Sequence, residues 1–287
     1  MTLKDRGIII TGASQGFGKA VATACVREGA HVLICARDEE LLNQTRHTLE
    51  AHAGPGQRVI SQRADVSQIE DVRSLIQTST RGLPSFDGLV NNAGVYGPKG
   101  LIEETDVLEW WRAIEINLLS VVLMCREAIP IFRRQGYGKV VNLSGGGATS
   151  PLPRLSAYAA SKAAVVRFTE TVAHETAGTG IDVNAVAPGA LNTRLLDEIL
   201  EVGPDRVGAA FFERAVQQKN RGGTPLESGA DLCAFLLSSA SDGISGRLIS
   251  AVWDRWPELA SHREELCQSD VYTLRRIIPQ DRGLKWE

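Results

Sequence analysis

The sequence contains no CxxC or HExxH motif, no long apolar run and no block of basic residues. Its five cysteines are scattered and its five histidines show no spacing typical of metal ligands. We therefore expect free thiols in a reducing compartment and no metal site. No apolar stretch reaches the roughly 18 residues that span a bilayer, and no signal peptide is expected. A net charge of −3 offers no basic surface for nucleic acid, so these absences predict a soluble cytoplasmic protein acting on small molecules.

Short β-branched runs alternate with longer stretches whose apolar residues recur at helical spacing. Seven of the runs are expected to be strands, at 7–12, 31–36, 58–63, 86–94, 138–144, 181–189 and 246–253. Apolar strands separated by helices indicate a parallel sheet that is covered on both faces. With right-handed crossovers, we predict an α/β fold: a single Rossmann-type doubly wound domain, with a seven-stranded parallel sheet and helices on both faces.

Two motifs indicate a dinucleotide-dependent enzyme. A glycine-rich turn, TGASQGFG at 11–18, joins the first expected strand to the first helix. Its glycines let the backbone turn tightly and approach a diphosphate, while the helix N-terminus offers N–H donors. Tyr158 and Lys162 lie four residues apart, on one face of a helix that begins near Ser156. An ammonium beside a phenol favours the phenolate, so this pair suits proton exchange with a substrate oxygen.

In these motifs the chain resembles the classical short-chain dehydrogenases/reductases, over roughly residues 5–252. TGASQGFG matches their TGxxxGxG, and the family's order continues with ADV at 64–66, NNAG at 91–94, EINLLS around Asn117, Tyr158-x-x-x-Lys162 and PGALNT at 188–193. The resemblance implies a nicotinamide cofactor and hydride transfer between a secondary alcohol and a ketone. It makes Tyr158 the proton donor or acceptor and assigns Asn117 to holding Lys162 through water.

The resemblance also implies which residues bind the cofactor. They are Gly12, Ser14, Gln15, Gly16, Phe17, Arg37, Asp65, Val66, Asn91, Ala93, Gly94, Tyr158, Lys162, Pro188, Gly189, Leu191 and Thr193. Family members that use NAD carry an acidic residue at the end of the second strand, where this chain has Ala36 followed by Arg37. A guanidinium suits the 2′-phosphate of NADP, so we favour NADP(H) over NAD(H), although the neighbouring Asp38 weakens the contrast.

One catalytic position departs from the family. Its serine is placed thirteen residues before the tyrosine, and counting back from Tyr158 gives Gly145. Ser144 is adjacent, yet successive residues of a strand point to opposite faces. Three interpretations stay open: the glycine-rich turn brings Ser144 into the site, Thr149 or Ser150 reaches in from the loop, or no hydroxyl is used. The predicted catalytic set consists of Tyr158, Lys162, Asn117 and Ser144.

Two regions interrupt the alternation of strands and helices. Residues 190–225 are long for a connection between a strand and a helix, which is typical of a functional segment, and we expect a substrate loop there. Residues 254–287 continue beyond the last strand and carry several large apolar side chains. We therefore expect a dinucleotide-binding catalytic domain over 1–253 and a C-terminal extension over 254–287 that packs on it.

Substrate and alternative functions are less constrained. Arg154 lies four residues before Tyr158 and Arg194 lies at the start of the substrate loop, so both are predicted substrate contacts for an anionic group next to an apolar or ring portion. The resemblance implies a homodimer or homotetramer. Two other functions stay open: a non-catalytic dinucleotide sensor or scaffold, which Gly145 favours, and a sugar epimerase or dehydratase that acts through a transient ketone.

Overall fold

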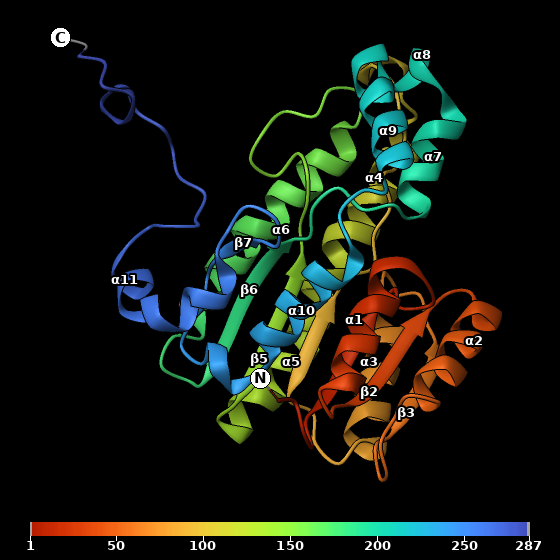
Figure 1. Cartoon of the computed structure of the whole chain (residues 1–287), viewed down its shortest axis with the longest axis vertical. Helices are drawn as coiled ribbons and strands as arrows, with labels where there is room; N and C mark the ends of the chain where they lie inside the picture. Colours follow the sequence, from red (N-terminus) through yellow and green to blue (C-terminus); the bar gives the residue numbers. More distant parts are fainter. Residues whose placement is uncertain (1, 286–287) are drawn as a thin grey trace.

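The computed structural model describes residues 2–285, so residues 1 and 286–287 of the two predicted regions lie outside the described part of the chain. Seven parallel strands form one sheet in the order β3-β2-β1-β4-β5-β6-β7. Figure 1 shows β3 and β7 at opposite edges of this sheet. The strands are β1 (Gly7–Thr11), β2 (His31–Ala36), β3 (Val59–Arg63), β4 (Gly88–Asn91), β5 (Gly138–Leu143), β6 (Ile181–Ala187) and β7 (Leu248–Ser250). The predicted α/β fold is confirmed, and the strand order reverses between β1 and β4.

Helices cover both faces of the sheet. They are α1 (Gly16–Arg27), α2 (Glu39–Glu50), α3 (Ile69–Gly82), α4 (Val107–Ile114), α5 (Ser120–Gln135), α6 (Ser156–Glu175), α7 (Arg194–Val202), α8 (Pro204–Val207), α9 (Ala209–Arg221), α10 (Leu226–Leu237) and α11 (Arg263–Gln268). A short π-helical segment, Glu115–Leu119, joins α4 to α5. Among residues 2–285, every helix is too short or too polar to traverse a bilayer.

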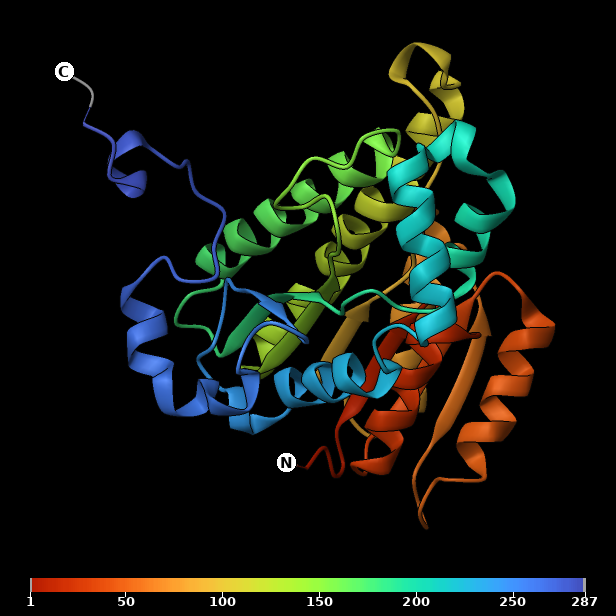
Figure 2. The ribbon, with the colours of Figure 1, turned by 45° about the horizontal axis from the view of Figure 1, so that its top comes forward.

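The core has two layers because successive strand residues face opposite sides. In β1, Ile8 and Ile10 join a buried cluster with α1 and α10, which lie against each other (Figure 2). Ile9 points the other way, into a cluster with residues of α3, α5 and α6. The central strands β1 and β2 are apolar on both sides for this reason, whereas the edge strand β3 is partly exposed.

The predicted substrate loop folds into α7, α8 and α9, which stand beyond the carboxyl ends of the strands (Figure 1). Their apolar side chains Leu196, Ile199 and Val207 form a separate buried cluster that includes Tyr158. Lys99 Nζ lies 3.3 Å from a carboxylate oxygen of Glu198 on α7. This contact and the cluster hold the three helices close to the end of the sheet.

Part of the C-terminal extension packs on the sheet domain. Leu259 and Leu266 are buried in the same cluster as α1 and α10. The guanidinium of Arg247 donates hydrogen bonds to the carbonyls of Leu266, Ser269 and Val271. These bonds fix the extension near β7. Beyond residue 274 the chain runs away from the domain (Figures 1 and 2).

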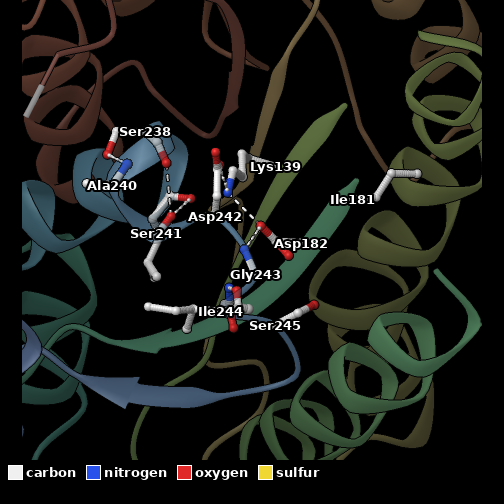
Figure 3. A network of polar contacts seen from close by, with 12 residues as sticks. Lys139, Ile181, Asp182, Ser238, Ala240, Ser241, Asp242, Gly243, Ile244 and Ser245 are labelled. Atoms are coloured by element: carbon white, nitrogen blue, oxygen red, sulfur yellow. Dashed lines mark hydrogen bonds and ion pairs between the residues drawn. The ribbon is translucent and has the colours of Figure 1, made fainter. Parts of the chain in front are cut away.

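An ion-pair network joins β5 to its neighbours at the amino ends of the strands (Figure 3). The ammonium of Lys139, a side chain only 1% exposed, lies 2.6 Å from Asp182 and 2.7 Å from Asp242. The backbone N–H of Gly243 also donates to Asp182, at 3.0 Å. One buried cation therefore holds β5, β6 and the segment after α10 together, at the end of the sheet opposite α7–α9.

We expect Lys139→Ala to destabilise the protein by about 3–5 kcal/mol, because it leaves two carboxylates facing each other without their buried cation. The free energy of unfolding in urea measures the effect. Lys219→Ala is a matched control, since Lys219 pairs with Asp197 at the surface, where both side chains are about half exposed. That variant should lose less than about 1 kcal/mol. Equal losses in the two variants would contradict the prediction.

Candidate active site

Hydrogen bonds between side chains and backbone groups join the carboxyl ends of β1 and β4, where the strand order reverses. The hydroxyl of Thr11 accepts from the backbone N–H groups of Asn92 and Ala93, at 3.0 and 3.1 Å. The Asn92 amide in turn donates to the carbonyls of Thr11 and Gly12, at 2.9 and 3.0 Å. In doubly wound sheets the ligand crevice lies at this reversal point, and here its floor is rigidly held.

The glycine turn after β1 fits a dinucleotide diphosphate. Gly12 and Gly16 have φ angles of 62° and 56°, which favour glycine. A Cβ on Gly12 would stand 2.8 Å from the backbone of Ala93, and one on Gly18 would stand 2.3 Å from the carbonyl of Gly12. Thr193 faces the turn, with its methyl 3.4 Å from a Cβ placed on Gly16. Gly12 and Gly18 therefore have no room for side chains, and the turn presents bare backbone at these glycines before and within the first turn of α1.

A cavity of about 1400 Å³ begins at this turn and extends to Tyr158 and α7–α9. Most of the residues predicted to bind cofactor line it. They are Gly12, Ser14, Gln15, Gly16, Phe17, Arg37, Asp65, Val66, Ala93, Gly94, Tyr158, Lys162, Pro188, Gly189, Leu191 and Thr193. The set reaches from one end of the cavity to the other, so the residues present fit an extended dinucleotide.

Asn91, also predicted to bind cofactor, does not line this cavity. Its side chain is buried and donates a 2.8 Å hydrogen bond to Asn142 on β5. Asn142 in turn donates to Thr169 on α6. The side chain of Asn91 therefore joins β4 to β5, and its neighbour Asn92 takes the place beside the glycine turn. In the sequence, the signal for this role of Asn92 is its place as the second asparagine of the NNAG motif.

The far end of the cavity carries charged groups beside β2. Arg37 is exposed and lines the cavity. Asp38 lines it too, but its carboxylate accepts the N–H of Leu41 as the N-cap of α2. Burial alone would raise the pKa of Asp65, yet hydrogen bonds from Ser67, helped by the nearby charge of Arg112, lower it below the usual value. Asp65 is therefore ionised, and its oxygens already bind Ser67 and Arg112.

Tyr158 and Lys162 meet at the inner end of the cavity. Tyr158 lies in the first turn of α6, and Lys162 lies one turn further along the same face. The Lys162 ammonium donates a 2.7 Å hydrogen bond to the carbonyl of Leu143, at the end of β5. It lies 5.6 Å from the centre of the Tyr158 ring. The predicted pair is thus assembled on one wall of the cavity.

Burial controls the protonation of this pair. It raises the pKa of Tyr158 well above the ordinary value of a phenol, so the hydroxyl carries its proton at neutral pH in the protein without ligand. It lowers the pKa of Lys162 from 10.5 to about 8. Lys162 therefore remains mainly charged at pH 7 and can favour the phenolate when Tyr158 gives up a proton.

Asn117 lies behind Lys162 in the π-helical segment and has no exposed surface. Its amide binds both backbone groups of Val95, at 2.8 Å each, and donates to the hydroxyl of Ser161 at 3.0 Å. Gly94 separates it from Lys162, since a Cβ there would stand 3.3 Å from Asn117 and 3.7 Å from the ammonium. The side chain thus fixes the loop after β4 against α6.

Gly145 lies beside the reactive hydroxyl. A Cβ at this position would stand 2.6 Å from Tyr158 Oη. Ser144, also on the cavity wall, directs its hydroxyl to the carbonyl of Lys162 at 3.4 Å. Thr149 lines the cavity as well, whereas Ser150 does not. Glycine thus occupies the position directly beside the Tyr158 hydroxyl, and Ser144 as a catalytic group remains a prediction.

The two predicted substrate arginines are separated. Arg154 adopts a φ of 67° and donates to the carbonyl of Asp205 at 2.8 Å, so it supports α8 and does not line the cavity. Arg194 does line it, 3.6 Å from Glu198. Arg214 and Arg221 of α9 line the cavity too. Tyr96, which the sequence reasoning did not single out, lies next to Tyr158 on the same wall.

Comparison with known proteins agrees with this geometry. Residues 6–202 match the family model described as short chain dehydrogenase. The chain belongs to the short-chain dehydrogenase/reductase family. It is 34% identical over 235 residues to an L-fucose dehydrogenase of Oryctolagus cuniculus, covering 82% of this chain and 79% of that one.

Solved structures support the fold. A structure of actinorhodin polyketide ketoreductase with NADPH has a TM-score of 0.79 at 27% identity, covering 87% of this chain and 97% of that one. A structure of NAD⁺-bound xylitol dehydrogenase has the same TM-score at 23% identity, covering 87% and 98%, and shows likeness of fold alone. The predicted activity follows from the family: the chain is an NAD(P)-dependent oxidoreductase that interconverts an alcohol and a ketone, and the sensor and epimerase alternatives are not favoured.

We expect Lys162→Met to stabilise the fold at pH 7 while it removes the ammonium. The lowered pKa corresponds to a cost of about 3 kcal/mol below pH 8, offset by about 1 kcal/mol for the bond to Leu143. Between pH 8 and 10.5 the unfolded wild type binds more protons than the folded one, so wild-type stability rises with pH there. The advantage of the variant should therefore shrink over that range.

Urea unfolding at several pH values measures this difference. Lys219→Met, at an exposed ion pair, is the control and should show a small difference from wild type that does not fall between pH 8 and 10. A Lys162→Met variant less stable than wild type at pH 7 would refute the expectation.

Proposed function

We propose that Tyr158 exchanges the proton in this reaction and that Lys162 holds the charge that makes the exchange possible. The observation that carries the proposal is their meeting at the inner end of a cavity that starts at the glycine turn. In the direction of reduction, Tyr158 donates its proton to the carbonyl oxygen and becomes a phenolate beside the ammonium. Asn117 keeps Gly94 and the loop after β4 in place behind Lys162.

The nicotinamide, when bound, supplies or accepts the hydride. In our proposal the glycine turn and the start of α1 bind the diphosphate through backbone N–H groups, and Thr193 closes over it from the start of α7. Asp65 and Val66 line the cavity beyond the turn, where the adenine would lie. Pro188, Gly189 and Leu191 form the opposite wall.

We also propose a preference for NADP(H) over NAD(H). No acidic side chain occupies the end of β2, because Ala36 stands there. Arg37 is exposed beside the cavity, and its guanidinium suits a phosphate. One oxygen of the Asp38 carboxylate accepts the N–H of Leu41 as the cap of α2, which leaves the other oxygen at the cavity as the feature that weakens the contrast.

For the substrate we propose a ketone or secondary alcohol with an apolar or ring portion next to an anionic group. The wall beyond Tyr158 combines Leu196, Ile199 and Phe211 with the guanidinium groups of Arg194 and Arg214. Arg154 would act only indirectly, by holding α8.

We further propose that the chain works in the cytoplasm as a homodimer or homotetramer. Residues 1–253 would form the catalytic unit and residues 254–287 an extension of it. Neither nucleic acid nor a membrane is a proposed partner. Several large apolar side chains around α4 are exposed and support self-association: Leu101, Ile102, Val107, Leu108, Trp111 and Leu119. Light scattering of the purified chain gives its mass in solution, and a monomer would rule this assembly out.

The activity is tested by incubating the purified chain with NADPH and a panel of cyclic and acidic ketones. We expect reduction of at least one ketone, and Tyr158→Phe should lower kcat by about 10²-fold or more because the proton donor is lost. Binding of NADPH, measured by its fluorescence, should be similar in both proteins. Unchanged turnover in Tyr158→Phe would exclude the role of this residue.

The cofactor preference is tested by the dissociation constants of NADPH and NADH. We expect NADPH to bind more tightly, and Arg37→Gln to weaken NADPH by about 10-fold or more while NADH changes little, since a charged hydrogen bond contributes about 1.5–3 kcal/mol. Arg73→Gln on α3, at an exposed ion pair, is the control. Tighter binding of NADH to the wild type would show that the preference is the reverse.

A further inference from the structure

The proton-donating hydroxyl of Tyr158 lacks the neighbour that a side chain at 145 would give it. A Cβ on Gly145 would stand 2.6 Å from Tyr158 Oη, so the tyrosine fills the space where such a side chain would begin. Ser144 does not fill the gap in this arrangement, because its hydroxyl is directed to the carbonyl of Lys162. A carbonyl oxygen that approaches Tyr158 would therefore receive one hydrogen bond from it and none from β5.

Tyr96 lies on the other side of Tyr158. It follows β4 and the NNAG segment, and its ring centre lies 4.8 Å from that of Tyr158 at an interplanar angle of 64°. Both residues line the cavity. Among residues 2–285, no hydrogen bond is made by the hydroxyl of either tyrosine, while neither oxygen is sealed off in the interior. Tyr96 therefore brings a free hydroxyl group to the wall where the substrate must bind.

The surroundings of Tyr96 hold its ring firmly. It packs against the buried cluster of Leu155, Tyr158, Leu196 and Ile199. The ammonium of Lys99, bound to the carbonyl of Gly97 and to Glu198, lies 5.9 Å from the ring centre. Contacts from α6, α7 and the loop after β4 thus fix the orientation of the ring before any substrate arrives, which is the condition for an effective donor.

The chemistry of Tyr96 suits donation without proton transfer. Burial raises its pKa to about 12, with a further contribution from the negative charge of Glu198. The hydroxyl therefore keeps its proton at neutral pH. The ammonium of Lys99 lies 5.9 Å from the Tyr96 ring centre, but Glu198 pairs with it. The ammonium of Lys162, 5.6 Å from the Tyr158 ring centre, binds a neutral carbonyl instead. The two tyrosines differ in this respect, so one can transfer a proton while the other only shares its own.

We propose that Tyr96 donates a second hydrogen bond to the carbonyl oxygen of the substrate, in place of the hydroxyl that Gly145 cannot supply. This inference rests on the proposed role of Tyr158. In reduction, the hydride adds to the carbonyl carbon, the C=O π electrons move to oxygen, and that oxygen takes the proton of Tyr158. Tyr96 stabilises the negative charge that develops on the oxygen and keeps its O–H bond intact.

The test is Tyr96→Phe, which preserves the ring packing and removes only the hydroxyl. We expect kcat for the best ketone to fall by about 10²–10³-fold, as for loss of one donor to a developing oxyanion. The KM of the ketone and the dissociation constant of NADPH should stay within about threefold, because the bond strengthens in the transition state. Tyr137→Phe, at the opposite end of the sheet next to Arg6, is the matched control and should keep wild-type activity.

Thr149→Val is measured beside it, because Thr149 also lines the cavity. A large loss of kcat in Thr149→Val with none in Tyr96→Phe would overturn the proposal and place the donor in the loop. A rise in KM alone in Tyr96→Phe would overturn it too, because it indicates a packing role. If wild type is active, Tyr158→Phe is inactive and Tyr96→Phe is unaffected, this inference fails while the proposed function stands. A wild type that reduces no ketone overturns both.

Discussion

The site depends on the hydrogen bonds that join β1 to β4 through Thr11 and Asn92. The strand order reverses between β1 and β4. The connections after these two strands therefore lead in opposite directions, and a crevice opens at the carboxyl ends of the strands. Without those bonds, the glycine turn and the NNAG segment would be two separate loops with no fixed position relative to each other. With them, the turn is fixed at one end of the cavity, and the backbone of Ala93 and Gly94 continues from it toward Lys162. The chain directly after the NNAG segment places Tyr96 next to Tyr158.

The buried lysine at the site sets a conflict between stability and chemistry. The fold accepts Lys162 with a hydrogen bond to the carbonyl of Leu143, and residues 2–285 place no carboxylate beside it. Lys139, at the other end of the sheet, is also buried but has two carboxylate partners. A carboxylate next to Lys162 would neutralise the field that favours a phenolate on Tyr158. The absence of such a partner within the described part of the chain is therefore consistent with a working ammonium, whereas Lys139 has a structural role.

The sequence predicts most of this fold because the relevant signals are local. The central strands β1, β2, β4 and β5 are largely apolar and buried, and the partly exposed edge strands β3 and β7 fit the same alternation of strands and helices. The four-residue spacing of Tyr158 and Lys162 likewise fixes their common face on α6. The sequence leaves the orientation of Ser144 open; its hydroxyl lies 3.4 Å from the carbonyl of Lys162, while the residue also lines the cavity.

Other features depend on contacts between distant segments, which spacing does not reveal. The sequence predicts that Arg154 faces the substrate, but its positive φ and its bond to the carbonyl of Asp205 direct it toward α8. Asn91 and Asn92 are adjacent in the sequence, yet strand geometry directs the first to β5 and the second to the glycine turn. Tyr96 belongs to none of the motifs by which the sequence resembles the family. Its relation to Tyr158 exists only because β4 and β5 are neighbours in the sheet and α6 follows β5.

The lack of a side chain at Gly145 is part of the geometry that brings Tyr158 and Tyr96 together. Tyr158 reaches the space beside β5 because no Cβ stands there, and the edge of one tyrosine ring then packs against the other. A serine at 145 would require the Tyr158 hydroxyl to move, since a distance of 2.6 Å is shorter than an ordinary contact with a carbon atom. Such a shift would also disturb the packing of Tyr96 against Leu196 and Ile199. Glycine at 145 and tyrosine at 96 are thus compatible with one geometry of Tyr158, and the common serine is compatible with another.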